Sequence, residues 1–179
     1  MRFQGTAYRG HDPRWSFKPL SGEGAAVHGG RFNPQGVRAL YLALDLVTAV
    51  QEINQGFVRR IDPLVLCSYD IDCADIVDLR LAPAQAAYGL DPAQMACGWM
   101  MLAKSGIAPP TWTLAQRLRA GGAAGLLAPS YAPGVKPEAA NLVLWTWTPN
   151  PPPPLHGARS QRKVAEGSAE LGVGIGSAS

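Results

Sequence analysis

The sequence has few cysteines and no long apolar run. Its three cysteines, Cys67, Cys73 and Cys97, form no C-x-x-C pair, so we expect reduced thiols rather than a disulfide framework or a zinc site. No stretch approaches the roughly 18 apolar residues that a membrane-spanning helix needs, and the start, MRFQGTAYRG, lacks a signal-peptide core. These absences predict a soluble, cytoplasmic protein that holds no metal and contacts no membrane.

The sequence also lacks a large net charge. The net charge is only +3, and no basic stretch is interleaved with aromatic residues, which argues against direct nucleic-acid binding. The phosphate-binding motifs G-x-x-x-x-G-K-[ST] and G-x-G-x-x-G are absent, and so are the H-E-x-x-H motif of zinc hydrolases and the G-x-S-x-G motif of serine hydrolases. None of these common motifs therefore points to a catalytic or binding site in this chain.

The 179 residues and their 47% apolar content are enough to bury the core of one globular domain. Composition changes at Pro149, where a proline run (151–154) and a small, polar, glycine-rich segment follow. We therefore predict a folded catalytic domain over residues 1–148 and a Pro/Gly-rich tail over 149–179.

Strands and helices are expected to mix without regular βαβ alternation, which favours an α+β fold with mixed or antiparallel sheets flanked by helices. Helices are predicted from the N-caps Asp45 (to a stop at Gly56), Asp91 (running on to Lys104) and Thr111 or Thr113 (to a stop at Gly121). The glycine-rich, polar segment 21–30 is expected to be a loop or the entrance to a strand. Strands are predicted at 2–9, 40–43, 64–69, 76–79, 124–128 and 141–147.

The segment 29–52 contains the most distinctive residues of the chain. Two glycines precede Arg31, a short apolar run contains Tyr41, and an amphipathic helix carries Glu52. Taken singly, such an arginine is usually solvated, such a tyrosine belongs to the core, and such a glutamate faces water. Residues alone leave those ordinary interpretations open.

Together these three side chains suit one reaction, the cleavage of an N-glycosidic bond to nicotinamide. The transition state resembles an oxocarbenium ion, so a carboxylate such as Glu52 would stabilise it. An aromatic ring such as Tyr41 could stack on nicotinamide, and a guanidinium such as Arg31 could bind the diphosphate.

The order of residues resembles the signature of the RES-domain family. The resemblance rests on Gly29-Gly30-Arg31-Phe32-Asn33 with Gly36, then Ala39–Ala43, Thr48-Ala49 and Glu52, together with Tyr8-Arg9-Gly10, Pro129-Ser130 and Asn141–Leu144. It covers roughly residues 6 to 147. The arginine, glutamate and serine that give the family its name correspond to Arg31, Glu52 and Ser130.

The resemblance implies a fold similar to diphtheria-type ADP-ribosyltransferases and a toxin that consumes NAD+ as substrate. Its partner would be a cognate Xre-like antitoxin with a helix-turn-helix. The ADP-ribose would pass to water, to phosphate or to a protein such as a phosphoribosyl pyrophosphate synthetase. The residues implied as catalytic are Glu52, Arg31 and Tyr41, and those implied as NAD-binding are Arg9, Arg31, Tyr41, Ser130 and Asn141.

Two further matters stay open at this point. A non-catalytic module could use the same basic cleft for a nucleotide or a partner, although Glu52 would weaken simple binding of an anion. The apolar segment around Trp99 could be buried in the core or against a second subunit, so a homodimer within the complex is an open expectation.

Overall fold

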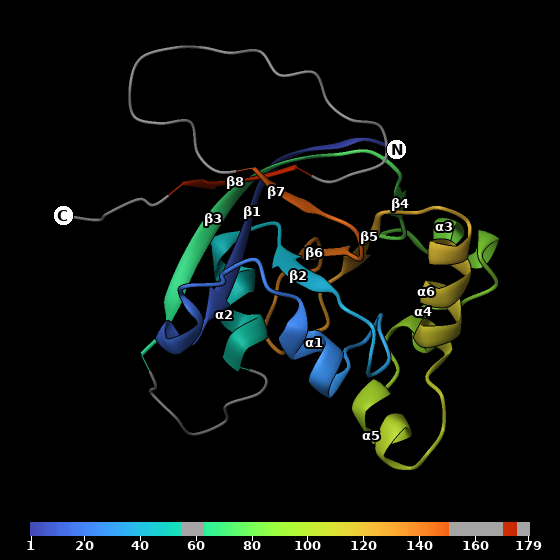
Figure 1. Ribbon diagram of the computed structural model, residues 1–179. Coiled ribbons are helices and arrows are strands. Elements are labelled where there is room, and N and C mark those ends of the chain that lie inside the picture. Colours follow the sequence, from blue (N-terminus) through green and yellow to red (C-terminus); the bar gives the residue numbers. More distant parts are fainter. Residues whose placement is uncertain (55–62, 151–169, 175–179) are drawn as a thin grey trace.

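The computed structural model describes residues 1–54, 63–150 and 170–174, and one curved sheet lies at its centre (Figure 1). Its strand order is β4-β5-β6-β2-β1-β3-β8-β7, with only β4–β5 and β7–β8 parallel. The predicted α+β class with a mixed sheet is confirmed. The strands are β1 (Phe3–His11), β2 (Leu40–Ala43), β3 (Val65–Cys73), β4 (Ile76–Asp78), β5 (Gly125–Pro129), β6 (Ala140–Leu144), β7 (Thr148–Asn150) and β8 (Glu170–Gly174).

Helices lie beside this sheet, and α2 contacts β1 and β2 while α4 packs against α6. No described helix is long and apolar enough to cross a membrane. The helices are α1 (Glu23–His28), α2 (Leu46–Asn54), α3 (Ala82–Ala87), α4 (Pro92–Met95), α5 (Trp99–Lys104) and α6 (Pro110–Ala120), and a 3-10 turn spans Pro13–Trp15.

The two faces of the sheet bury two different cores, as alternation along β6 shows. Leu142 and Leu144 join a cluster of residues from β1 to β6 that includes no helix residue, so the strands curve around it. Val143, between them, joins a second cluster with Met95 of α4 and Leu114 of α6. The sheet is thus covered by helices on one face, and Tyr41 of β2 packs on that side.

Several predicted elements are confirmed, and others are wrong. The strand at 40–43 and the Asp45-capped helix occur as expected. The helix predicted from Asp91 to Lys104 is instead two helices, because the backbone leaves helical geometry at Gly98. The last long helix begins after Pro109 rather than at a threonine, since Pro110 has a fixed φ and lacks the N–H that a cap would satisfy.

The segment 21–30 was predicted as a loop or a strand entrance, and this is wrong, because it contains helix α1 despite its glycines. The predicted helix end at Gly56 lies outside the described residues. The division at residue 148 stays a prediction, since most of 149–179 is also outside them. Within that predicted tail, Glu170–Gly174 forms β8 and pairs with Ser68–Asp72 of β3, so this segment is part of the sheet.

Candidate active site

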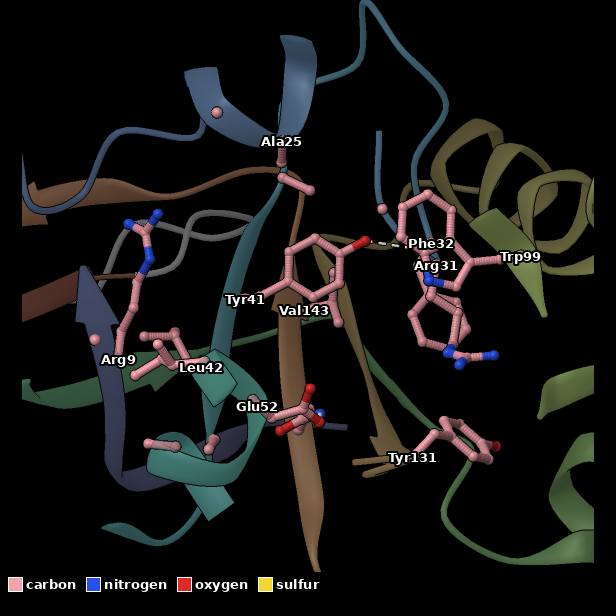
Figure 2. A pocket seen from close by; sticks show the side chains of 18 of the residues that line it. Arg9, Ala25, Arg31, Phe32, Tyr41, Leu42, Glu52, Trp99, Tyr131 and Val143 are labelled. Atoms are coloured by element: carbon pink, nitrogen blue, oxygen red, sulfur yellow. Dashed lines mark hydrogen bonds between the residues drawn. The ribbon is translucent and has the colours of Figure 1, made fainter. Parts of the chain in front are cut away.

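A cavity of about 500 Å³ opens on the helix-covered side of β2 and β6. Its lining includes Tyr41 of β2, Asn141 of β6, Glu52 of α2 and Arg31 from the loop that follows α1. Figure 2 shows Glu52 near the Tyr41 ring, with Arg9 and Arg31 on opposite sides of that ring. Five of the six site residues named from sequence line this cavity, and the sixth, Ser130, contacts it through Glu52.

Glu52 is positioned by residues distant in sequence. Ser130, just after β5, donates its hydroxyl to Glu52 Oε1 at 2.6 Å, and Asn141 donates its amide to the same oxygen. The backbone N–H of Ala132 donates to Ser130 Oγ at 3.3 Å, which fixes the hydroxyl. The Asn141 amide must turn its N–H toward the carboxylate, because two facing oxygens would repel. Two donors on one oxygen hold the carboxylate in a fixed orientation.

Arg31 is a partly buried cation held by backbone carbonyls. Its Nη1 donates to the carbonyl oxygens of Met95 at 2.9 Å and Cys97 at 2.7 Å, in the break between α4 and α5. Its guanidinium carbon lies 4.3 Å from the ring centroid of Tyr131. Burial lowers the pKa of Arg31, although nearby Cys97, Tyr131 and Glu52 oppose that change, and a guanidinium remains charged in any case.

Tyr41 connects the strand to the loop that carries Arg31. Its hydroxyl donates to Asn33 Oδ1 at 2.7 Å and accepts from the backbone N–H of Phe32 at 2.9 Å. Burial raises the pKa of this hydroxyl far above its ordinary value, so it stays protonated. With the hydroxyl occupied, the ring is the part of Tyr41 that is available to a ligand.

The Arg31 loop is further fixed by side chains that sequence reasoning missed. Asn33 donates to three backbone carbonyls, those of Ala25, Pro34 and Val37. The indole N–H of Trp112 binds the carbonyl of Gly30 at 2.8 Å, and that of Trp145 binds the carbonyl of Phe32 at 3.1 Å. These bonds satisfy buried backbone groups that a loop would otherwise leave unpaired, and so make the loop rigid.

Arg9 lies on the opposite side of Tyr41 and supports the wall of the cavity. Its Nη1 donates to the carbonyl oxygens of Pro19 at 2.6 Å and Ser21 at 3.2 Å. Burial lowers the pKa of Arg9 as well. No ion pair in the described part of the chain includes Arg9 or Arg31. Two partly buried guanidiniums without a carboxylate at ion-pair distance favour an anionic ligand in this cavity.

Sequence reasoning also missed Tyr131 and Trp99, which line the cavity beside Arg31. Tyr131 follows the noted Pro129-Ser130 pair by one residue, so that pair was the one available signal. Trp99 lies in a segment expected to be largely buried. Trp99 is the first residue of α5, directly after the break between α4 and α5.

Comparison with known proteins decides the family. The sequence matches the RES domain over residues 6–161. The chain belongs to the RES domain family. The match includes every site residue discussed above, from Arg9 to Asn141.

The RES chain also shares its fold with a protein in a solved crystal structure of a complex. One chain in the crystal structure of the M. tuberculosis MbcT-MbcA toxin-antitoxin complex superposes with a TM-score of 0.60 at 24% sequence identity. The match covers 80% of this chain and 75% of that one. At this identity the likeness concerns the fold. No curated protein sequence matches the chain.

Proposed function

We propose that this RES chain is the toxin of a toxin–antitoxin pair and that it cleaves the nicotinamide–ribose bond of NAD+. The observation that carries the proposal is the fixed carboxylate of Glu52 in a cavity that also contains two partly buried guanidiniums. A dinucleotide with a diphosphate and a ribosyl centre offers charges that complement both features. Membership of the RES family and the fold shared with a toxin-antitoxin complex support the same function.

The proposed reaction transfers the ADP-ribosyl group. The bond between ribose C1′ and the nicotinamide nitrogen breaks, and its electron pair leaves with nicotinamide, which departs neutral. Glu52 stabilises the positive charge that develops on the ribose. The oxygen of the acceptor then bonds to C1′ and loses its proton. The Tyr41 ring stacks on nicotinamide, and Arg31 and Arg9 bind the diphosphate or ribose side.

The direct test is the release of nicotinamide from NAD+ by the purified chain. Wild type is expected to release it, and Glu52→Gln to lower the rate by a factor on the order of 100 to 1,000, since the charge that stabilises the transition state is lost. Glu138→Gln, an exposed position outside the cavity, serves as the matched control. Binding of NAD+ without any turnover would instead identify a non-catalytic module.

The acceptor is the next question, and three acceptors are distinguished by two measurements. Incubation of labelled NAD+ with lysate leaves label on a specific protein band only if ADP-ribose is transferred to a protein. If the release of nicotinamide requires phosphate, the reaction is phosphorolysis, and if it does not, water is the acceptor.

The proposed partner is an Xre-like antitoxin, and the proposed location is the cytoplasm. Co-expression of the chain with its neighbouring antitoxin gene is expected to restore growth that the chain alone arrests. A homodimer within that complex stays a prediction. The exposed Met100 and Met101 of α5, 51% and 77% accessible, offer it an apolar contact surface.

A further inference from the structure

A second pocket lies beside the segment 17–21, and its lining is distinct from that of the cavity that holds Glu52. Its volume is about 640 Å³, within the range of small-molecule sites. Phe17 and Lys18 line it from that segment, Glu23 from α1, and Arg38 and Trp147 from the residues that flank β2 and β6. No described residue lines both pockets. Nothing in the proposed cleavage of NAD+ uses this second pocket.

Arg38 and Trp147 make a cation–π contact in this pocket. The guanidinium carbon of Arg38 lies 5.4 Å from the ring centroid of Trp147. The indole is fixed, because its N–H donates to the carbonyl of Leu20 at 3.1 Å. Arg38 is exposed, so the outer face of its guanidinium can stack on a second planar ring. Phe17, 70% exposed, offers another aromatic face at the same pocket.

The charges of the pocket are arranged for an anion that also carries hydrogen-bond donors. Lys18 and Arg38 take part in no ion pair within the described residues. An ammonium and a guanidinium are the two side-chain groups that bind phosphate best. Glu23 is the single acid that lines the pocket, and a carboxylate accepts hydrogen bonds from vicinal ribose hydroxyls or from an exocyclic amine.

We propose that this pocket binds a nucleoside monophosphate. Its base stacks on Arg38 and Phe17, its phosphate binds Lys18 and the edge of Arg38, and its ribose or amino group bonds to Glu23. Each part of the ligand thus meets a group of matching chemistry. A simple acidic peptide would supply negative charge but no planar ring to stack on the guanidinium of Arg38. A nucleotide supplies both a ring and a negative charge.

The pocket shares a wall with the active-site cavity. Leu20 accepts the hydrogen bond from Trp147 on one side, while its neighbours Pro19 and Ser21 accept from Arg9 on the other. For this reason Trp147 and Leu20 are left unchanged in the test, and only exposed side chains of the pocket are replaced.

The test is calorimetric titration of the full chain with AMP, GMP, CMP and UMP. At least one nucleotide is expected to bind, and the matching nucleoside and ribose 5-phosphate to bind at least about tenfold more weakly, since each lacks one half of the contacts. No binding by any of the four nucleotides would overturn the proposal, and so would equal binding of ribose 5-phosphate.

Variants and photolabelling locate the site. Arg38→Ala and Lys18→Ala are expected to weaken nucleotide binding about tenfold or more. Arg38→Lys is also expected to weaken it, because lysine keeps the positive charge but has no planar group on which the base can stack. Arg119→Ala, an exposed cation on α6, is the matched control and should bind as wild type does. Labelling by 8-azido-AMP within residues 17–23 or 145–147 supports the site. Labelling confined to peptides of the Glu52 cavity contradicts it.

Discussion

At the scale of single residues, Arg31 shows how this protein keeps a charge available for a ligand. Its contacts are two neutral carbonyls and the face of Tyr131 rather than a carboxylate. Carbonyl oxygens and an aromatic ring stabilise the guanidinium without neutralising it. The full positive charge of Arg31 therefore remains, and in the proposed function Tyr131 is a positioning residue that holds this guanidinium toward the anion.

Replacing Tyr131 by leucine is expected to raise the KM for NAD+ roughly threefold to thirtyfold, since a desolvated cation–π contact contributes about 0.5–2 kcal/mol. The kcat should change little, because Glu52 is untouched. Tyr131→Phe keeps the ring and should resemble wild type. Steady-state kinetics of nicotinamide release measure both constants. If phenylalanine proved as harmful as leucine, the hydroxyl and not the ring would be the important group.

At the scale of elements, helix α2 must begin at the right residue for Glu52 to reach the cavity. Asp45 caps this helix by accepting from the backbone N–H of Thr48 at 2.8 Å and from the Thr48 hydroxyl. Slight burial opposes ionisation of Asp45. The hydrogen bonds from Thr48 outweigh that effect and hold the pKa of Asp45 below its ordinary value of 3.8.

The sign of the pH dependence follows from that lowered pKa. A carboxylate with a lowered pKa in the folded state adds stability above its unfolded pKa, near 4, and loses it as the pH falls through the folded pKa. Asp45→Ala should cost about 1 kcal/mol at pH 7. Asp45→Asn keeps a capping oxygen, and its difference from wild type should shrink below about pH 4. Urea unfolding at several pH values measures both, and a difference that grew with acid would contradict the assignment.

The Arg31 loop depends on a glycine for steric reasons. A Cβ at Gly30 would overlap the Tyr41 hydroxyl and lie 2.6 Å from Asn33 Oδ1. Gly30→Ala is expected to destabilise the chain by about 1–3 kcal/mol and to lower activity, because the loop must move. Gly24→Ala is the control, since its Cβ meets nothing within 4 Å and alanine should stabilise helix α1 slightly. Thermal unfolding of the two variants compares them directly.

At the scale of the whole molecule, the partly buried charges of Arg9 and Arg31 destabilise the folded state when the cavity holds no ligand. A ligand that supplies the missing negative charge binds the folded state alone and stabilises it, by about 2.7 kcal/mol at 100 times its Kd. NAD+ should therefore raise the Tm of Glu52→Gln, a variant chosen to prevent turnover. The same shift should be lost in Glu52→Gln combined with Arg31→Ala. An equal Tm shift in both variants would show that Arg31 does not bind the dinucleotide.

Much of the fold was predictable because its signals are local. The four apolar residues of β2 and the Asp45 cap of α2 are short-range patterns, and they place Tyr41 and Glu52 correctly. The α4–α5 break was missed, because Gly98 lies inside an otherwise apolar run whose composition suits one helix. Helix α1 was missed because its glycines suggest a loop, although the short helix is accommodated beside β2.

The sequence by itself determined the family, because the order of residues along the chain matches the RES domain. It also determined the strand and the helix that carry Tyr41 and Glu52, because both form from local patterns. Only the tertiary structure decided how those residues are held. Glu52 is oriented by Ser130 and Asn141. Arg31 is held by carbonyls in the break after α4. These partners lie 64 to 89 residues away in sequence. Such contacts form only when the strands and helices pack together, so no local sequence pattern encodes them.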